Sequence, residues 1–351
     1  MLLNILFILI GFLLLVKGGD FLIDGAVAIA QRARLSNMVI GITVIGFGTS
    51  MPELLVSTQA AWVGSSGLAI GNVAGSNIAN IALILGFTAL IHPLPSTRMM
   101  LLIDIPFMLL AMTLFVLSTF LFGTIDRWLG ILMVSLLIAF ITWEILRSRR
   151  QSKRTAPSSV SSSPVSSPLT ATAPSSVSPS PVSSAATSSQ STPLMPLWRA
   201  ILLVLISLAA MVWGADLLID GSSAIAMQLG EYFGVEKEQM ERIIGLTVVA
   251  VGTSLPELFA SVMAARKGET DMAVGNIIGS VTFNVLCVVG IASAITPIHN
   301  AWAPFALDYA VMLFLGFLLW FFLRTHRKIV RYEGAILFLI YCLYIAKTLL
   351  F

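Results

Sequence analysis

One six-residue phrase occurs twice in the chain, each time within apolar residues numerous enough to cross a bilayer. The copies, residues 48–53 and 252–257, are 204 positions apart and differ only at the residue before the proline. A carboxylate at bilayer depth is energetically costly, so its presence favours a functional role. The adjacent proline lacks the N–H that a helix needs, which breaks the helix beside the carboxylate. Two halves that each supply a broken helix and a glutamate indicate one shared polar site, as in transporters.

The composition excludes an ordinary soluble domain, because 57% of the residues are hydrophobic and 11% are charged. Ten apolar segments have about the 20-residue length that spans a bilayer. They cover residues 2–30, 37–63, 68–92, 99–122, 126–147, 197–228, 243–265, 271–297, 303–323 and 331–350. We therefore expect an all-α membrane protein with ten transmembrane helices and no nucleic-acid partner. Cys287 and Cys342 lie in apolar segments and indicate neither a disulfide nor a metal site.

Lysine and arginine are distributed unequally between the loops. If the ten helices alternate in direction, 15 of the 20 Lys and Arg residues lie on one side, four lie on the other, and Lys17 falls within the first helix. The positive-inside rule then predicts that both termini lie on the outer side. Residues 149–196 are dominated by Ser, Pro, Ala, Thr and Val, which predicts a disordered cytoplasmic linker. It separates a first repeat, 1–148, from a second, 197–351, and five helices in each require the repeats to be inverted.

The repeat extends well beyond the six-residue phrase. At the same offset of 204, the matched pairs include Gly41 with Gly245, Ser57 with Ser261, Asn72 with Asn276, Ser76 with Ser280, Asn80 with Asn284, Asp104 with Asp308 and Gly130 with Gly334. In the first segment the offset falls to 196, where Asp20 pairs with Asp216. Extra residues around 231–242 account for this change, and we expect them to form a polar excursion on the outer face.

Polar residues form two stripes in each half, because residues three or four apart share a helix face. The stripes comprise Thr49, Ser50, Glu53 and Ser57, then Asn72, Ser76 and Asn80, with their counterparts in the second half. Carboxylate, hydroxyl and amide oxygens are the ligands that hard cations such as calcium prefer. A purely structural buried carboxylate would need a Lys or Arg partner, which neither segment offers. Glu53 and Glu257 are therefore the candidate centre of a cation site.

With these motifs the chain resembles the calcium/cation antiporter superfamily, in its sodium/calcium exchanger branch. The resemblance rests on the paired G-T-S-x-P-E phrase followed by G-N-x-x-G-S, and it covers both halves but not the linker. It implies inverted five-helix repeats with broken helices around a central ion site, where sodium entry drives calcium out. It also implies a plasma-membrane location (the inner membrane in a bacterium), no enzymatic activity, no cofactor and no obligatory protein partner.

The resemblance further implies roles for individual residues. The implied cation-binding set is Glu53 and Glu257 as central carboxylates, Thr49, Ser50, Thr253, Ser254, Ser76 and Ser280 as side-chain or carbonyl ligands, Asn80 and Asn284, and the carbonyls of Gly46 and Ala250. Within this set, Glu53, Glu257, Thr49 and Thr253 would bind the central metal ion. Val281 stands where family members usually have Asn, a difference that concerns local packing.

Three other functions compete with sodium/calcium exchange. A proton/calcium exchanger, or an exchanger of another divalent cation, typically carries its acid in a G-N-x-x-E phrase, which this chain lacks. A passive cation channel would not need two matched inverted half-sites. An intramembrane serine hydrolase using Ser50 or Ser254 would need a base. The three histidines, however, lie at helix ends or in loops: His92, His299 and His326.

Overall fold

The computed structural model describes residues 2–64, 66–155, 195–232, 250–299 and 305–350, and these are almost wholly helical. The first half contains α1 (Leu2–Ala33), α2 (Asn37–Ile40), η1 (Gly41–Ile45), α3 (Gly46–Thr49), α4 (Met51–Trp62), α5 (Ser66–Ile78), η2 (Ala79–Leu85), α6 (Gly86–Ile91), β1 (Leu94–Pro95), η3 (Met100–Asp104), α7 (Ile105–Phe122) and α8 (Arg127–Thr155). The second half contains α9 (Leu197–Tyr232), α11 (Ala250–Gly252), α12 (Leu255–Arg266), α13 (Thr270–Phe283), η5 (Asn284–Val289), α14 (Gly290–Ile295), α15 (Ala306–His326), β2 (Lys328–Ile329) and α16 (Arg331–Leu350). The η segments are π-helical and continue the α-helices on either side.

Most of these helices suit a bilayer. Seven helices in the described residues are long and apolar enough to cross a membrane, and one bent pair, Asn37–Thr49 with Met51–Trp62, adds an eighth candidate. The chain is thus an all-α membrane protein. The predicted segment 243–265 is described only from Ala250 onward. Most of the predicted linker and most of the predicted outer excursion lie outside the described residues.

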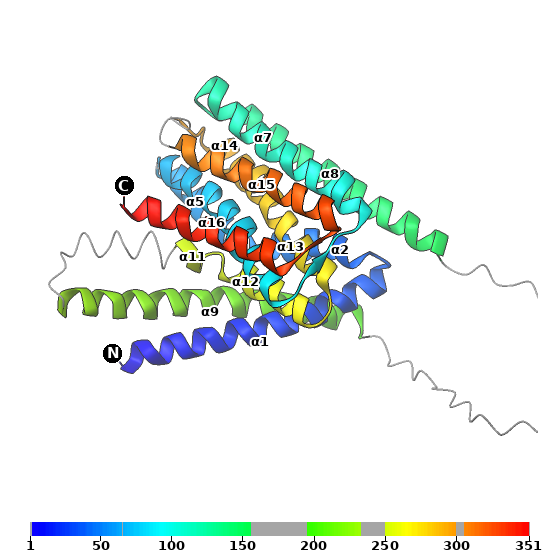
Figure 1. Cartoon of the computed structure of the whole chain (residues 1–351), viewed down its shortest axis with the longest axis horizontal. Helices are drawn as coiled ribbons and strands as arrows, with labels where there is room; N and C mark the ends of the chain where they lie inside the picture. Colours follow the sequence, from blue (N-terminus) through cyan, green and yellow to red (C-terminus); the bar gives the residue numbers. More distant parts are fainter. Residues whose placement is uncertain (1, 65, 156–194, 233–249, 300–304, 351) are drawn as a thin grey trace, which may run out of the picture.

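The longest helices, α1 and α9, lie side by side at one edge of the molecule (Figure 1). They run antiparallel, because Gly11 approaches Gly214 whereas Gly25 approaches Ala200. A Cβ atom on Gly11 would lie 2.5 Å from the Gly214 carbonyl oxygen, so only glycine permits this approach. Small residues that bring backbones together are a main source of helix association in membranes.

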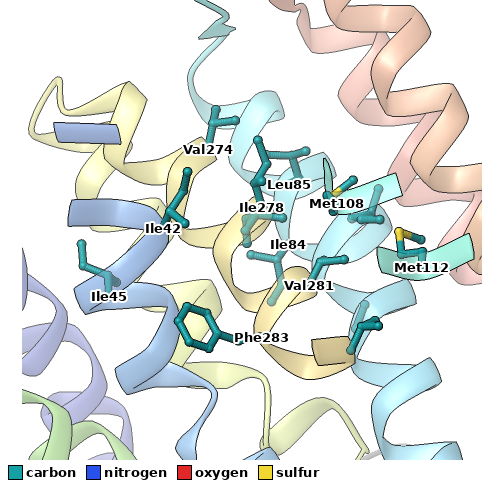
Figure 2. Close-up of a cluster of buried hydrophobic side chains, with 14 of the residues drawn as sticks. Ile42, Ile45, Ile84, Leu85, Met108, Met112, Val274, Ile278, Val281 and Phe283 are labelled. Carbon is teal, nitrogen blue, oxygen red and sulfur yellow. The ribbon is translucent and has the colours of Figure 1, made fainter. Parts of the chain in front are cut away.

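The continuous helix Thr270–Ile295 forms the centre of the molecule. Its most apolar window is 89% buried, against 22% for α1. Figure 2 shows the apolar residues that surround α13, from η1, η2 and α7. The labelled members of this cluster are Ile42, Ile45, Ile84, Leu85, Met108, Met112, Val274, Ile278, Val281 and Phe283. Elements of both halves therefore share one core.

Contacts between the halves occur in matched pairs. In each pair, one contact becomes the other when 204 is added to the number of its first-half residue and subtracted from the number of its second-half residue. The matched contacts are Gly86–Gly334 with Gly130–Gly290, and Leu94–Ile329 with Ile125–Ile298. The last two are antiparallel backbone pairings, one in the β1–β2 ribbon and one in an isolated bridge. The sequence repeat thus has a counterpart in the way the halves touch.

Candidate cation site

The helix carrying each glutamate breaks at a serine. Ser50 has φ −82° and ψ 7°, and Ser254 has φ −91° and ψ 7°, so both leave the helical conformation. The following helices, α4 and α12, each have a proline at their start and a glutamate in their first turn. Proline suits the first turn because its missing N–H has no partner there in any helix. The positive end of the helix dipole then lies close to the carboxylate.

Glu53 and Glu257 are both fully buried, with 0% of each side chain exposed. They are close enough to repel each other electrostatically. Within the described residues, neither has a Lys, Arg or His partner, and three of their four carboxylate oxygens have no hydrogen-bond donor. A buried charge without a partner is strongly unfavourable, so this arrangement calls for a cation or protons.

Each glutamate faces a serine from the other half of the chain. The Ser50 hydroxyl donates to Glu257 Oε1 at 3.4 Å. Ser254 neighbours Glu53, although its hydroxyl is not in hydrogen-bond geometry. The two broken helices therefore cross so that each contributes one carboxylate and one hydroxyl to a common centre.

Further oxygens come from the threonines and from α13. The Thr49 hydroxyl lies 3.4 Å from Ser280 Oγ and donates to Asn276 Oδ1 at 3.3 Å. Thr253 Oγ1 is buried and has no partner among the described residues. Ser76, on α5, is also buried. Hydroxyl and amide oxygens thus surround the two carboxylates, a donor set suited to hard cations.

Two asparagines hold the glutamate-bearing helices in place. Asn72 Nδ2 donates to Ser57 Oγ at 2.9 Å and to the Glu53 carbonyl oxygen at 3.3 Å. The counterparts Asn276, Ser261 and Glu257 repeat both bonds at the same distances. The hydroxyls of the two serines are therefore engaged in helix–helix hydrogen bonds, which points to a structural role for them.

Asn80 and Asn284 are fully buried in π-helical segments η2 and η5. Asn284 Nδ2 donates to Asn77 Oδ1 at 3.3 Å. The Asn284 Oδ1 atom and both polar atoms of Asn80 lack hydrogen-bond partners in the described part of the chain. π-Helical turns often occur at functional sites. The two amides are thus buried polar groups with capacity left for a ligand.

The two predicted carbonyl ligands differ in their local bonding. The Gly46 carbonyl oxygen accepts a hydrogen bond from Ser50 N at 3.2 Å, which leaves one lone pair. The Ser254 N–H bonds to the Val251 carbonyl, not to that of Ala250. Gly46 also lies against Gly279, where an added Cβ would meet backbone atoms at 3.1 Å. The broken helix and α13 therefore cross at two glycines.

The structure also contains a second set of buried acidic residues, which the sequence did not predict to lie together. Arg147 Nη2 lies 2.9 Å from Glu144 Oε2 and 3.8 Å from Asp104 Oδ1. Both acidic side chains are fully buried. The only signal in the sequence was the i, i+3 pair of Glu144 and Arg147 in an apolar segment. Unlike the two central glutamates, these carboxylates share a basic partner.

Comparison with known proteins places the chain among transporters. The family described as "Sodium/calcium exchanger protein" matches residues 3–146 and 199–350. The putative antiporter CaxA of Alkalimonas amylolytica is 34% identical over 343 residues, and the sodium/calcium exchanger MaX1 of Methanosarcina acetivorans is 34% identical over 361 residues. Each alignment covers 96% of both chains. A solved structure of the sodium-calcium exchanger NCX_Mj, soaked with Na⁺ and Ca²⁺, superposes with a TM-score of 0.75 at 27% identity, covering 99% of this chain and 98% of that one.

Proposed function

Because the chain belongs to the sodium/calcium exchanger family, a family of transporters and not of enzymes, we propose that it exchanges sodium for calcium across a membrane through a site centred on Glu53 and Glu257. The observation that carries this proposal is a pair of fully buried carboxylates, one from each half, without a basic partner in the described residues. The relative MaX1, described as a sodium/calcium exchanger, supports the choice of ions.

The two glutamates together bind one calcium ion. Two anions close together at low dielectric repel by several kcal/mol unless a divalent cation or protons neutralise them. Thr49 and Thr253 complete the calcium site with oxygen ligands, while Ser50, Ser254, Ser76 and Ser280 provide further positions that sodium can occupy. Protons compete for the same carboxylates, so exchange falls as the pH becomes acidic.

Charge counting makes the exchange electrogenic. Asn80 and Asn284 are neutral, so one calcium ion balances the two carboxylates of the core. More than two sodium ions would leave the loaded core with net positive charge, and each excess charge couples to the membrane potential by about 2.3 kcal/mol per 100 mV. The family resemblance implies that relatives requiring potassium tend to carry Asp at the position of Asn284, so no potassium requirement is expected here.

The architecture proposed for this cycle is ten transmembrane helices in two inverted repeats. The matched contacts Gly86–Gly334 and Gly130–Gly290 support it, because equivalent contacts on both halves let the two exchange conformations. Alternating access then opens the central site to each side in turn. The distribution of Lys and Arg supports a cytoplasmic linker and outer termini, in a plasma membrane that would be the inner membrane of a bacterium.

The decisive test is calcium uptake into sodium-loaded proteoliposomes, with potassium varied and the membrane potential clamped by an ionophore. Uptake should require an outward sodium gradient, proceed without potassium, and accelerate when the interior is positive. Uptake without any sodium gradient would instead indicate a channel, and uptake driven only by a proton gradient would indicate a proton/calcium exchanger. Rates that ignore the potential would contradict electrogenic coupling.

A further inference from the structure

A cavity of about 320 Å³ lies outside the glutamate site, between the start of the η3–α7 helix and the end of α15. Its lining residues are Arg98, Leu101, Leu102, Trp320, Arg324 and Arg327. The β1–β2 pairing joins the segments that flank it, with Leu94 opposite Ile329. We propose that this cavity binds the phosphate headgroup of an anionic phospholipid from the surrounding bilayer.

The first reason is unbalanced positive charge. The side chains of Arg98, Arg324 and Arg327 are exposed, and none of them forms an ion pair in the described residues. Guanidinium groups match the geometry of phosphate oxygens and can bind them in bidentate fashion. Three such groups around one cavity favour a phosphate-bearing ligand.

The second reason is that the arginines converge on an apolar, preorganised wall. Trp320 donates from Nε1 to the Leu101 carbonyl oxygen at 3.3 Å, which fixes the indole. The guanidinium of Arg324 stacks over this indole, 5.1 Å from the ring centroid. Leu102 next to it is 61% exposed. Tryptophan and arginine at the end of a membrane helix are typical of the headgroup region, and the exposed leucine can contact acyl chains. This mixture suits an amphiphile better than a free anion.

The third reason is an internal comparison of two helix ends. Helices α7 and α15 both end at a residue in the left-handed conformation: Gly123, with φ 64°, and Arg327, with φ 52°. These two residues are matched by the 204-residue offset. Glycine is the usual occupant of such a position because a Cβ atom is strained there. The second half thus carries a strained arginine at the cavity where the first half has glycine.

The matching edge of the first half lacks this chemistry. At the same offset, Arg324 corresponds to Phe120 and Trp320 to Val116. Under the predicted topology, the arginine-lined end of α15 lies on the cytoplasmic side, where anionic lipids attract basic groups. The arginine cluster, with Arg98 from the first half and Arg324 and Arg327 from the second, therefore lies at one face of the protein, as a lipid site on one leaflet requires.

The test uses the full-length protein purified in detergent and native mass spectrometry to count bound phosphatidylglycerol, phosphatidylcholine or inorganic phosphate. The wild type should retain phosphatidylglycerol in preference to phosphatidylcholine. Each of Arg98→Gln, Arg324→Gln and Arg327→Gly should weaken phosphatidylglycerol binding about five-fold, the effect expected for one basic group near an anionic lipid. Arg327→Gly also relieves backbone strain, so a loss of lipid in that variant cannot be attributed to misfolding.

Arg34→Gly is the matched control. Arg34 is exposed, follows the end of α1 and also has positive φ, at 53°, but it does not line the cavity. This variant should retain phosphatidylglycerol at the wild-type level. The proposal fails if Arg34→Gly and Arg327→Gly lose lipid equally, or if both lipids bind equally well to the wild type. Inorganic phosphate that displaces phosphatidylglycerol and binds as tightly would identify a soluble-anion site and overturn the lipid assignment.

Discussion

At the centre of the molecule, Asn72 and Asn276 each donate the same two hydrogen bonds, at 2.9 and 3.3 Å, to a serine and to a glutamate carbonyl. At the ends of α7 and α15, by contrast, the matched residues are Gly123 and Arg327. The cation proposed to bind between the halves would need suitable ligands from both of them, which favours equivalent geometry there. The ends of α7 and α15 lie away from this site, so no shared ligand requires the two ends to have the same residues.

The matched aspartates outside the central site also differ between the halves. Asp104 lies beside Glu144 and Arg147, whereas its counterpart Asp308 accepts a hydrogen bond from the Tyr344 hydroxyl at 2.9 Å. Both aspartates lie near the start of a helix, but their carboxylates have different partners in the two halves. Substitutions in the glutamate site should therefore affect transport, and substitutions outside it should affect stability.

The largest effect is expected for Glu53→Gln and Glu257→Gln. Removing one of the two buried charges that the calcium ion neutralises costs about 3–5 kcal/mol, so calcium uptake should fall by about a hundredfold or more in each variant. The measurement is radiolabelled calcium uptake by correctly inserted protein. Glu231→Gln, at an exposed position near the end of α9, is the matched control and should transport normally. Wild-type rates in either central variant would remove that glutamate from the proposed site.

A smaller effect is expected where the halves cross. In Gly279→Ala, the new Cβ would lie 2.5 Å from the Ile42 carbonyl oxygen, so the backbones must separate. Overpacking of this kind typically costs about 1–3 kcal/mol. Thermal unfolding in detergent should show the loss, together with slower exchange. Gly67→Ala is the control, since its nearest described neighbour, an atom of Phe305, would be 3.8 Å away. Equal melting temperatures for the two variants would rule out a tight crossing at Gly279.

Asn284→Asp should change which cations are used without abolishing calcium binding. The added carboxylate raises the negative charge of the core, so an additional monovalent cation is needed to balance it. We expect the sodium concentration for half-maximal exchange to shift by about tenfold, or a potassium dependence to appear, corresponding to about 1.4 kcal/mol. Asn80→Asp, its matched counterpart, shows whether the halves respond alike. An unchanged cation dependence in both variants would argue against these amides as ligands.

The smallest effect is expected for shortening the Ser/Pro-rich linker, most of which lies outside the described residues. Its composition offers no cation ligands, and changing the length of a flexible tether alters closure entropy by only about 0.6 kcal/mol per twofold change. Exchange should stay within about twofold of wild type in flux assays. If transport disappears while membrane insertion is normal, the linker carries a regulatory function.

Local patterns in the sequence were sufficient for much of the fold. Apolar length predicted the helices, and the described helices coincide with the predicted segments apart from 243–265, which is only partly described. The breaks were predicted beside Pro52 and Pro256, and the structure places them two residues earlier, at Ser50 and Ser254. The polar stripes that hold the candidate ligands were also visible, because spacing along a helix determines which side chains share a face.

Other features depend on residues that only the folded chain brings together. The sequence grouped Asn72 with the candidate ligands, yet its hydrogen bonds give it a positioning role. Nor did it indicate that Arg98 and Arg324 line one cavity, since they are separated by more than two hundred positions. Composition and periodicity act within a helix and determined the helices, their breaks and the repeat. The packing of one helix against another depends on side-chain shape and on backbone approach at glycines such as Gly46 and Gly279, so the tertiary structure alone decided which polar groups meet.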